Sequence, residues 1–185
     1  MSNFIVYLGM RAGFDPTPHP GTFYYYLNDY NVEGAYNAIN KGDHSAYNGF
    51  AFRISPDKST IYTGMPANFR NPQYWKRNKH KILERFISKI EEMAMPHLSQ
   101  NIVYKDAATP HTLNRYTLNY HGASYGWAGT PSQIILSSFR KPPFIRNLYL
   151  VGHWTTFGVG ISGVAYLGYD TALAITRRDK RKADF

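Results

Sequence analysis

The segment 147–169, NLYLVGHWTTFGVGISGVAYLGY, constrains the fold of this chain more than any other. Its apolar start, Leu148–Val151, predicts a short buried strand, and the small residues from Ser162 predict a helix that runs to about Thr176. Between them lie glycines at 152, 158 and 160. A helix N-terminus presents unpaired N–H groups and a positive dipole end, and glycine lets a ligand lie directly on backbone. The segment therefore predicts a site for a flat or anionic ligand.

The glycines at 158, 160 and 163 have the spacing of a dinucleotide-binding fingerprint but not its context. That fingerprint follows a strand immediately and opens a βαβ unit. Here six residues separate Val151 from Gly158, and no second strand is predicted after the helix. On spacing alone the glycines could equally serve tight turns and helix packing.

The same segment resembles the C-terminal flavin-closing signature of the phytoene desaturase, carotenoid isomerase and retinol saturase family. These are FAD-dependent oxidoreductases of the amine-oxidase-like flavoprotein superfamily, and in them a strand leads into a loop of the form G-x-x-T-x-P-G-x-G-x-P-G-V. The matching residues here are Gly152, Thr155, Gly158, Gly160, Gly163 and Val164. Phe157 and Ser162 stand where the family usually has proline. The glycines are kept, but the loop has lost the stiffness that proline gives.

A second block resembles the same family. Residues 109–116 (TPHTLNRY) and 122–127 (GASYGW) resemble the family pattern T-P-x-T-x-x-R-Y-T followed by G-x-x-Y-G. From Phe4 to a helix ending near Ala94, the chain fits the family's substrate-domain strands and helix more loosely. The resemblance therefore spans nearly the whole chain and is specific only after Ala108.

The resemblance implies a set of cofactor and substrate residues. Those assigned to FAD are Gly152, His153, Gly158, Gly160, Ile161, Ser162, Gly163 and Val164. The N–H groups of Gly160–Val164 would face the N1–C2=O edge of the isoalloxazine, where charge accumulates on reduction. Tyr125 and Trp127 would wall an apolar substrate cavity, or would be ordinary core aromatics. His153 and Trp154 stand where the family often has small residues, so their roles stay open.

The family's N-terminal Rossmann unit, which binds the FAD pyrophosphate, has no counterpart before Gly152. We therefore expect a C-terminal fragment or subunit, completed by an N-terminal FAD-binding portion or a partner chain. The implied activity is hydride transfer between flavin and a polyene, isoprenoid or related apolar substrate. Alone, the chain is expected not to retain FAD and to be poorly soluble, because the Leu148–Val151 strand lacks neighbours.

The predicted fold class is α+β. An antiparallel substrate-domain sheet with a long helix would occupy residues 1–145. The last strand, loop and helix of a Rossmann-like FAD-binding domain would occupy 146–176, and a basic tail 177–185. The predicted strands are Phe4–Leu8, Thr22–Leu27, Gly49–Ile54, Thr60–Gly64 and Asn101–Tyr104, with helices over Val32–Ile39 and Pro72–Ala94. His111 and His121 are placed in a loop region.

Composition narrows the chemistry. The chain has no cysteine, which excludes disulfides, thiolate catalysis and cysteine-based zinc sites. No H-E-x-x-H, nucleophile elbow or P-loop occurs, so no catalytic residue and no metal ligand is nominated. Aromatic residues make up 16% of the chain, which suits either an apolar cavity or a tyrosine-rich sheet surface.

The formal net charge of +9 is concentrated in residues 76–81 and 177–182. These runs are either solvated polar faces or sites that attract anionic lipid headgroups, while nucleic-acid binding lacks a recognition module. Two other function classes remain open. One is a non-catalytic partner subunit of a flavoenzyme, and the other is a basic peripheral membrane-binding protein. No signal peptide or transmembrane run is evident, so a cytoplasmic or membrane-peripheral location is predicted.

Overall fold

A computed structural model describes residues 1–16, 19–27, 29–42, 49–127, 130–132, 144–155 and 160–183. The chain divides into two compact units, Met1–Ser124 and Tyr125–Phe185. The strands of the first unit are β1 Ser2–Met10, β2 Phe23–Tyr26, β3 Phe50–Ile54, β4 Thr60–Ala67 and β5 Ile102–Ala108. Its helices are α1 Val32–Lys41, α2 Pro72–Met93, η1 Ser99–Asn101, α3 Pro110–Thr117 and η2 Tyr120–Gly122. The second unit contains α5, Gly160–Ala183.

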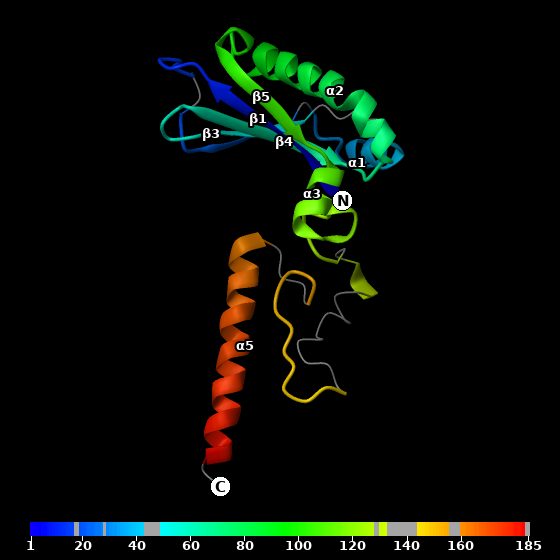
Figure 1. Cartoon of the computed structure of the whole chain (residues 1–185), viewed down its shortest axis with the longest axis vertical. Helices are drawn as coiled ribbons and strands as arrows, with labels where there is room; N and C mark the ends of the chain where they lie inside the picture. Colours follow the sequence, from blue (N-terminus) through cyan, green and yellow to red (C-terminus); the bar gives the residue numbers. More distant parts are fainter. Residues whose placement is uncertain are drawn as a thin grey trace. The chain divides into compact units, whose positions relative to one another are not determined.

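The five strands form one antiparallel sheet in the order β2-β3-β4-β1-β5 (Figure 1). The predicted antiparallel sheet is thereby confirmed, and β1 lies inside it, between β4 and β5. Residues 55–58 form the turn between β3 and β4, where the Lys58 N–H donates to the Ser55 carbonyl at 2.9 Å. In it the Asp57 carboxylate accepts hydrogen bonds from Ser55 Oγ at 2.5 Å and from Ser59 Oγ at 2.8 Å. These bonds hold the pKa of Asp57 below its ordinary value.

Helix α2 covers one face of the sheet and closes the core (Figure 1). Alternate residues of β1 are buried, so Phe4, Val6 and Leu8 point toward the helix with no exposed surface. The helix packs against them with an apolar stripe that consists of Trp75, Leu83, Phe86, Ile87 and Ile90. The rings of Phe4 and Trp75 stack with centroids 5.6 Å apart.

The ends of α2 match the sequence signals for them. The Asn71 side chain accepts a hydrogen bond from the Tyr74 backbone N–H at 2.7 Å, and Pro72 occupies the first turn. At the other end Met93 is the last helical residue, shortly before Pro96. The long helix predicted over Pro72–Ala94 is therefore confirmed almost to the residue.

The loop predicted around His111 is wrong, because His111 lies in α3. Thr109 caps this helix: its backbone N–H donates to Thr112 Oγ1, and its own Oγ1 accepts from the Thr112 N–H. Pro110 follows at the first helical position. The Thr-Pro-x-Thr spacing is a capping-box signal for a helix start. His121 lies outside α3, in η2, at a φ of 52°.

In the second unit, the strand predicted at Leu148–Val151 is not formed. A strand requires a neighbour for its backbone N–H and C=O groups, and no strand is described between residues 125 and 183. The Rossmann-like assignment is therefore not confirmed. Helix α5 is present and continues past Thr176 to Ala183. In the described part of the chain, no helix has an apolar stretch long enough to cross a bilayer.

Candidate functional site

In chain order, the last residues of the first family-like block meet the second block within the second unit. Trp127 Nε1 donates a hydrogen bond to the Trp154 carbonyl at 2.8 Å, and the two indole rings pack edge to face with centroids 5.3 Å apart. Gly126 allows this approach, since a Cβ atom there would lie 1.7 Å from the His153 carbonyl oxygen. The structure thus brings Gly126 and Trp127 against the start of the glycine loop.

His153, whose role the sequence left open, has a buried and unsatisfied ring nitrogen. Its Nε2 atom is shielded from solvent and has no hydrogen-bond partner among the described residues. Its ring lies 5.4 Å from that of Trp154, centroid to centroid. A buried polar atom without a partner is costly, so this nitrogen is a candidate for an interaction with a bound group.

The loop backbone and the start of α5 are open. Gly152 and Gly160 have φ angles of 127° and 79°, which favour glycine, and a Cβ at either position would meet no atom within 4 Å. Gly160, Ile161 and Ser162 are exposed, with Ile161 at 92%, and Gly163 and Val164 are half-buried. The predicted cofactor residues therefore do not lie in a packed interior. Gly158 lies outside the described residues.

The predicted substrate residues Tyr125 and Trp127 are 61% and 58% exposed, respectively. Both belong to the second unit, and Trp127 contacts Trp154 directly. Such exposure does not favour the alternative that they are core aromatics of this unit. Whether they wall a substrate cavity stays a prediction.

The sheet carries a second candidate site on the face opposite α2. We call this the open face; its side chains are Ile5, Tyr7, Phe23, Tyr25, Ala51, Arg53 and Tyr62. The register aligns Phe23, Arg53, Tyr62 and Tyr7 in one row across four neighbouring strands. Tyr25 is 78% exposed, Phe23 44% and Tyr7 43%. Aromatic rings gathered on one exposed sheet face make it a second candidate binding surface.

Sequence reasoning did not locate this face. The run Phe4–Leu8 is apolar at nearly every position, so it predicted a strand buried on both sides. The aromatic content of the chain was the signal, because it allowed a tyrosine-rich sheet surface as one of two alternatives. The structure shows that surface on β1, β2 and β4.

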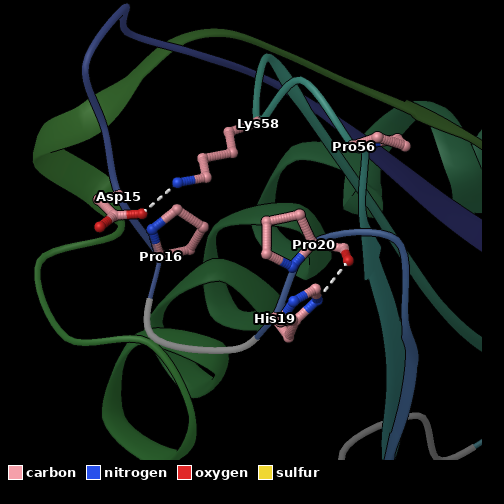
Figure 2. Close-up of a pocket in the computed structure, with 6 residues that line it drawn as sticks. All are labelled: Asp15, Pro16, His19, Pro20, Pro56 and Lys58. Carbon is pink, nitrogen blue, oxygen red and sulfur yellow. Dashed lines mark hydrogen bonds and ion pairs between the residues drawn. The ribbon is translucent and has the colours of Figure 1, made fainter.

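A cleft of about 690 Å³ lies beside the β3–β4 turn and is lined by Asp15, Pro16, His19, Pro20, Pro56 and Lys58. Figure 2 shows Lys58 reaching across it to Asp15, with 2.5 Å between Nζ and Oδ1, while His19 Nδ1 lies 2.8 Å from the Pro20 carbonyl. The charged groups of this cleft are thus already paired with each other. In the described part of the chain no cluster of metal-binding side chains occurs.

Comparison with known proteins finds distant relatives of this chain. No protein-family model matches the chain. The chain is similar to 4,4'-diaponeurosporene oxygenases of Staphylococcus aureus, with 23% identity for the proteins of strains MW2 and MSSA476 and 22% for that of strain USA300. Each match covers 97% of this chain and 38% of the relative. The chain therefore spans about two fifths of the length of these curated relatives. The similarity is consistent with the resemblance to a carotenoid oxidoreductase family.

Proposed function

We propose that this chain supplies the substrate-binding sheet and the flavin-facing loop of an oxidoreductase that acts on a carotenoid or a related polyene. One observation carries the proposal. A sheet face with exposed aromatic rings occurs in a chain that is similar, over 97% of its length, to a carotenoid oxygenase.

The open face suits a polyene in shape and chemistry. Neighbouring strands lie about 4.8 Å apart, so a row that crosses four strands offers a platform roughly 14 Å long. Phe23 and Tyr62 pack edge to face across it with centroids 6.1 Å apart, and Phe23 and Tyr25 lie 5.0 Å apart. A rigid conjugated chain loses little conformational entropy on such a surface and gains contact with π faces.

Binding of an uncharged fluorescent polyene tests this part of the proposal. We expect cis-parinaric acid methyl ester to bind the full chain, with an increase in its fluorescence. The double variant F23A/Y25A removes two exposed rings and should weaken binding by about 30-fold to 150-fold, at roughly 1–1.5 kcal/mol per ring. Titration at fixed protein concentration measures the dissociation constant.

The matched control is Tyr30→Ala. Tyr30 is fully exposed and lies outside every strand, so its removal should leave the affinity unchanged. Circular dichroism should show that both variants keep the fold, because Tyr25 and Tyr30 are largely solvent-exposed and Phe23 lies outside the buried core. Equal affinities for wild type and F23A/Y25A would contradict the proposal.

The second unit offers features that fit a flavin. The backbone is open at Gly152 and Gly160, and the buried His153 Nε2 lacks a partner among the described residues. The first N–H groups of α5 belong to exposed residues, where the helix dipole favours negative charge. We therefore assign the isoalloxazine end of FAD to Gly152, His153 and residues 160–164. A bound flavin would supply the hydride chemistry, and these residues would orient and polarise its ring.

Riboflavin and ADP-ribose separate the two ends of the cofactor. Riboflavin carries the isoalloxazine without the pyrophosphate, so we expect the chain to quench its fluorescence on binding. ADP-ribose carries the pyrophosphate and adenine half and should not compete, because the assigned residues contact only the ring. Competition by ADP-ribose at concentrations similar to the riboflavin dissociation constant would show that the assignment of ends is wrong. Absence of riboflavin binding would remove the flavin site from this chain.

A further inference from the structure

Arg53 is the one cation whose side chain belongs to the open face, among the residues described. It lies on β3 and is half-buried, with Phe23 beside it on β2 and Tyr62 beside it on β4. The other residues named for the open face are aromatic or aliphatic, and Asp106 of the edge strand β5 lies beside Tyr7 at its border. A guanidinium group is thus placed in the middle of an otherwise apolar binding surface.

The contacts of Arg53 leave its charge uncompensated. Its Nη1 atom lies 3.4 Å from Tyr62 Oη, a long hydrogen bond to a neutral group. Within the described ranges no carboxylate approaches it to ion-pair distance. The acid on this side of the sheet, Asp106, faces Tyr7 and is held by Lys79 with 2.6 Å between Nζ and Oδ1. That hydrogen bond lowers the pKa of Asp106, so the carboxylate is already engaged.

A pure hydrocarbon is a poor fit to this arrangement. Laying it over Arg53 would strip water from a guanidinium group without replacing the lost hydrogen bonds, which is costly. A ligand that carries a carboxylate avoids this cost. The planar fork of arginine matches a carboxylate in two parallel hydrogen bonds, and the Tyr62 hydroxyl can donate a third.

We propose that Arg53 and Tyr62 form a subsite for a carboxylate, so that the open face selects polyenes with an acidic end group over neutral ones. This inference rests on the proposed function, since it specifies the substrate class of the same face. Phe23 and Tyr25 on β2 hold the apolar part of the ligand, and Arg53 with Tyr62 holds its acidic end. The subsite therefore sets the position of the polyene as well as its identity.

The test compares cis-parinaric acid with its methyl ester, both titrated below the concentration at which they form micelles. The two probes share the polyene and differ in charge. We expect the wild-type chain to bind the acid at least tenfold more tightly than the ester, as charge-assisted hydrogen bonds would produce. The variant R53M keeps the length and apolar stem of the side chain and should abolish this preference. R53K keeps the charge but not the fork and should retain only part of it.

R77M is the matched control, because Arg77 is exposed on α2, the helix that covers the other face of the sheet. It should keep the full preference for the acid. Circular dichroism and unfolding midpoints establish that R53M is folded.

Three results decide the matter. If acid and ester bind wild type equally, or if R53M keeps the preference, the carboxylate subsite is wrong. If F23A/Y25A still weakens binding of the ester in either of these cases, the proposal that the open face binds polyenes stands. If neither probe binds, both the subsite and the proposed substrate face are overturned.

Discussion

Replacing Trp75 by alanine is expected to lower the free energy of unfolding of the first unit by about 3–5 kcal/mol. Trp75 is 3% exposed and belongs to the core between α2 and the sheet. Its ring stacks on Phe4 at 5.6 Å and meets Tyr74 edge to face at 5.2 Å. The substitution leaves a cavity between rigid elements, so the surrounding side chains cannot close it fully. Urea denaturation followed by far-UV circular dichroism measures the loss.

Two further variants serve as controls for Trp75→Ala. Trp75→Phe keeps most of the volume and one aromatic ring, so it should cost clearly less and should remain folded if the alanine variant does not. Arg77→Ala changes an exposed position of the same helix and should alter stability by no more than about 0.5 kcal/mol. A loss below about 1 kcal/mol for Trp75→Ala would mean that α2 does not close the core of the sheet as described.

Gly126→Ala is expected to separate Gly126 and Trp127 from His153 and Trp154 at the start of the glycine loop. The added Cβ would lie 1.7 Å from the His153 carbonyl oxygen and 2.6 Å from its carbon, both backbone atoms, so one chain segment must move. Overpacking of this kind costs about 1–3 kcal/mol. The movement should also break the hydrogen bond from Trp127 Nε1 to the Trp154 carbonyl. The affinity for riboflavin, which we assign to this loop, should decrease as well.

Tryptophan fluorescence reports this change directly. The chain has three tryptophans, so in a Trp75→Phe background the emission comes from Trp127 and Trp154 alone. We expect a red shift for Gly126→Ala as both indoles gain solvent. Gly168→Ala is the matched control, because its Cβ would meet only Val151 at 3.9 Å and alanine favours the interior of α5. An unchanged spectrum for Gly126→Ala would show that the two blocks are not held together.

Much of the first unit could be predicted from local sequence signals. The apolar runs of its strands and the amphipathic stretch from Pro72 are short-range patterns, although β1, β4 and β5 extend beyond their predicted ends. These features were found because each depends on residues close in the chain. The helix at Pro110–Thr117 carried an equally local signal in Thr109 and Thr112, which the sequence analysis did not use.

The prediction at Leu148–Val151 was wrong for a different reason. Its apolar residues permit a strand, but a strand exists only where a second strand pairs with it. Local pattern cannot supply that partner. At the end of α5 the sequence pattern predicted too little structure. The basic run after Thr176 was assigned to a tail, but it continues the helix to Ala183, where its positive charge complements the helix dipole.

The amino-acid sequence by itself determined the strand positions and the long helix α2 of the first unit, and it carries the resemblance on which the proposed function draws. Only the tertiary structure decided which side of the sheet stays open, that Arg53 stands alone among its aromatic rings, and that Gly126 lies against His153. The physical reason is that burial and contact depend on residues far apart in the chain. A strand such as β1, apolar on both faces, does not reveal which face α2 will cover.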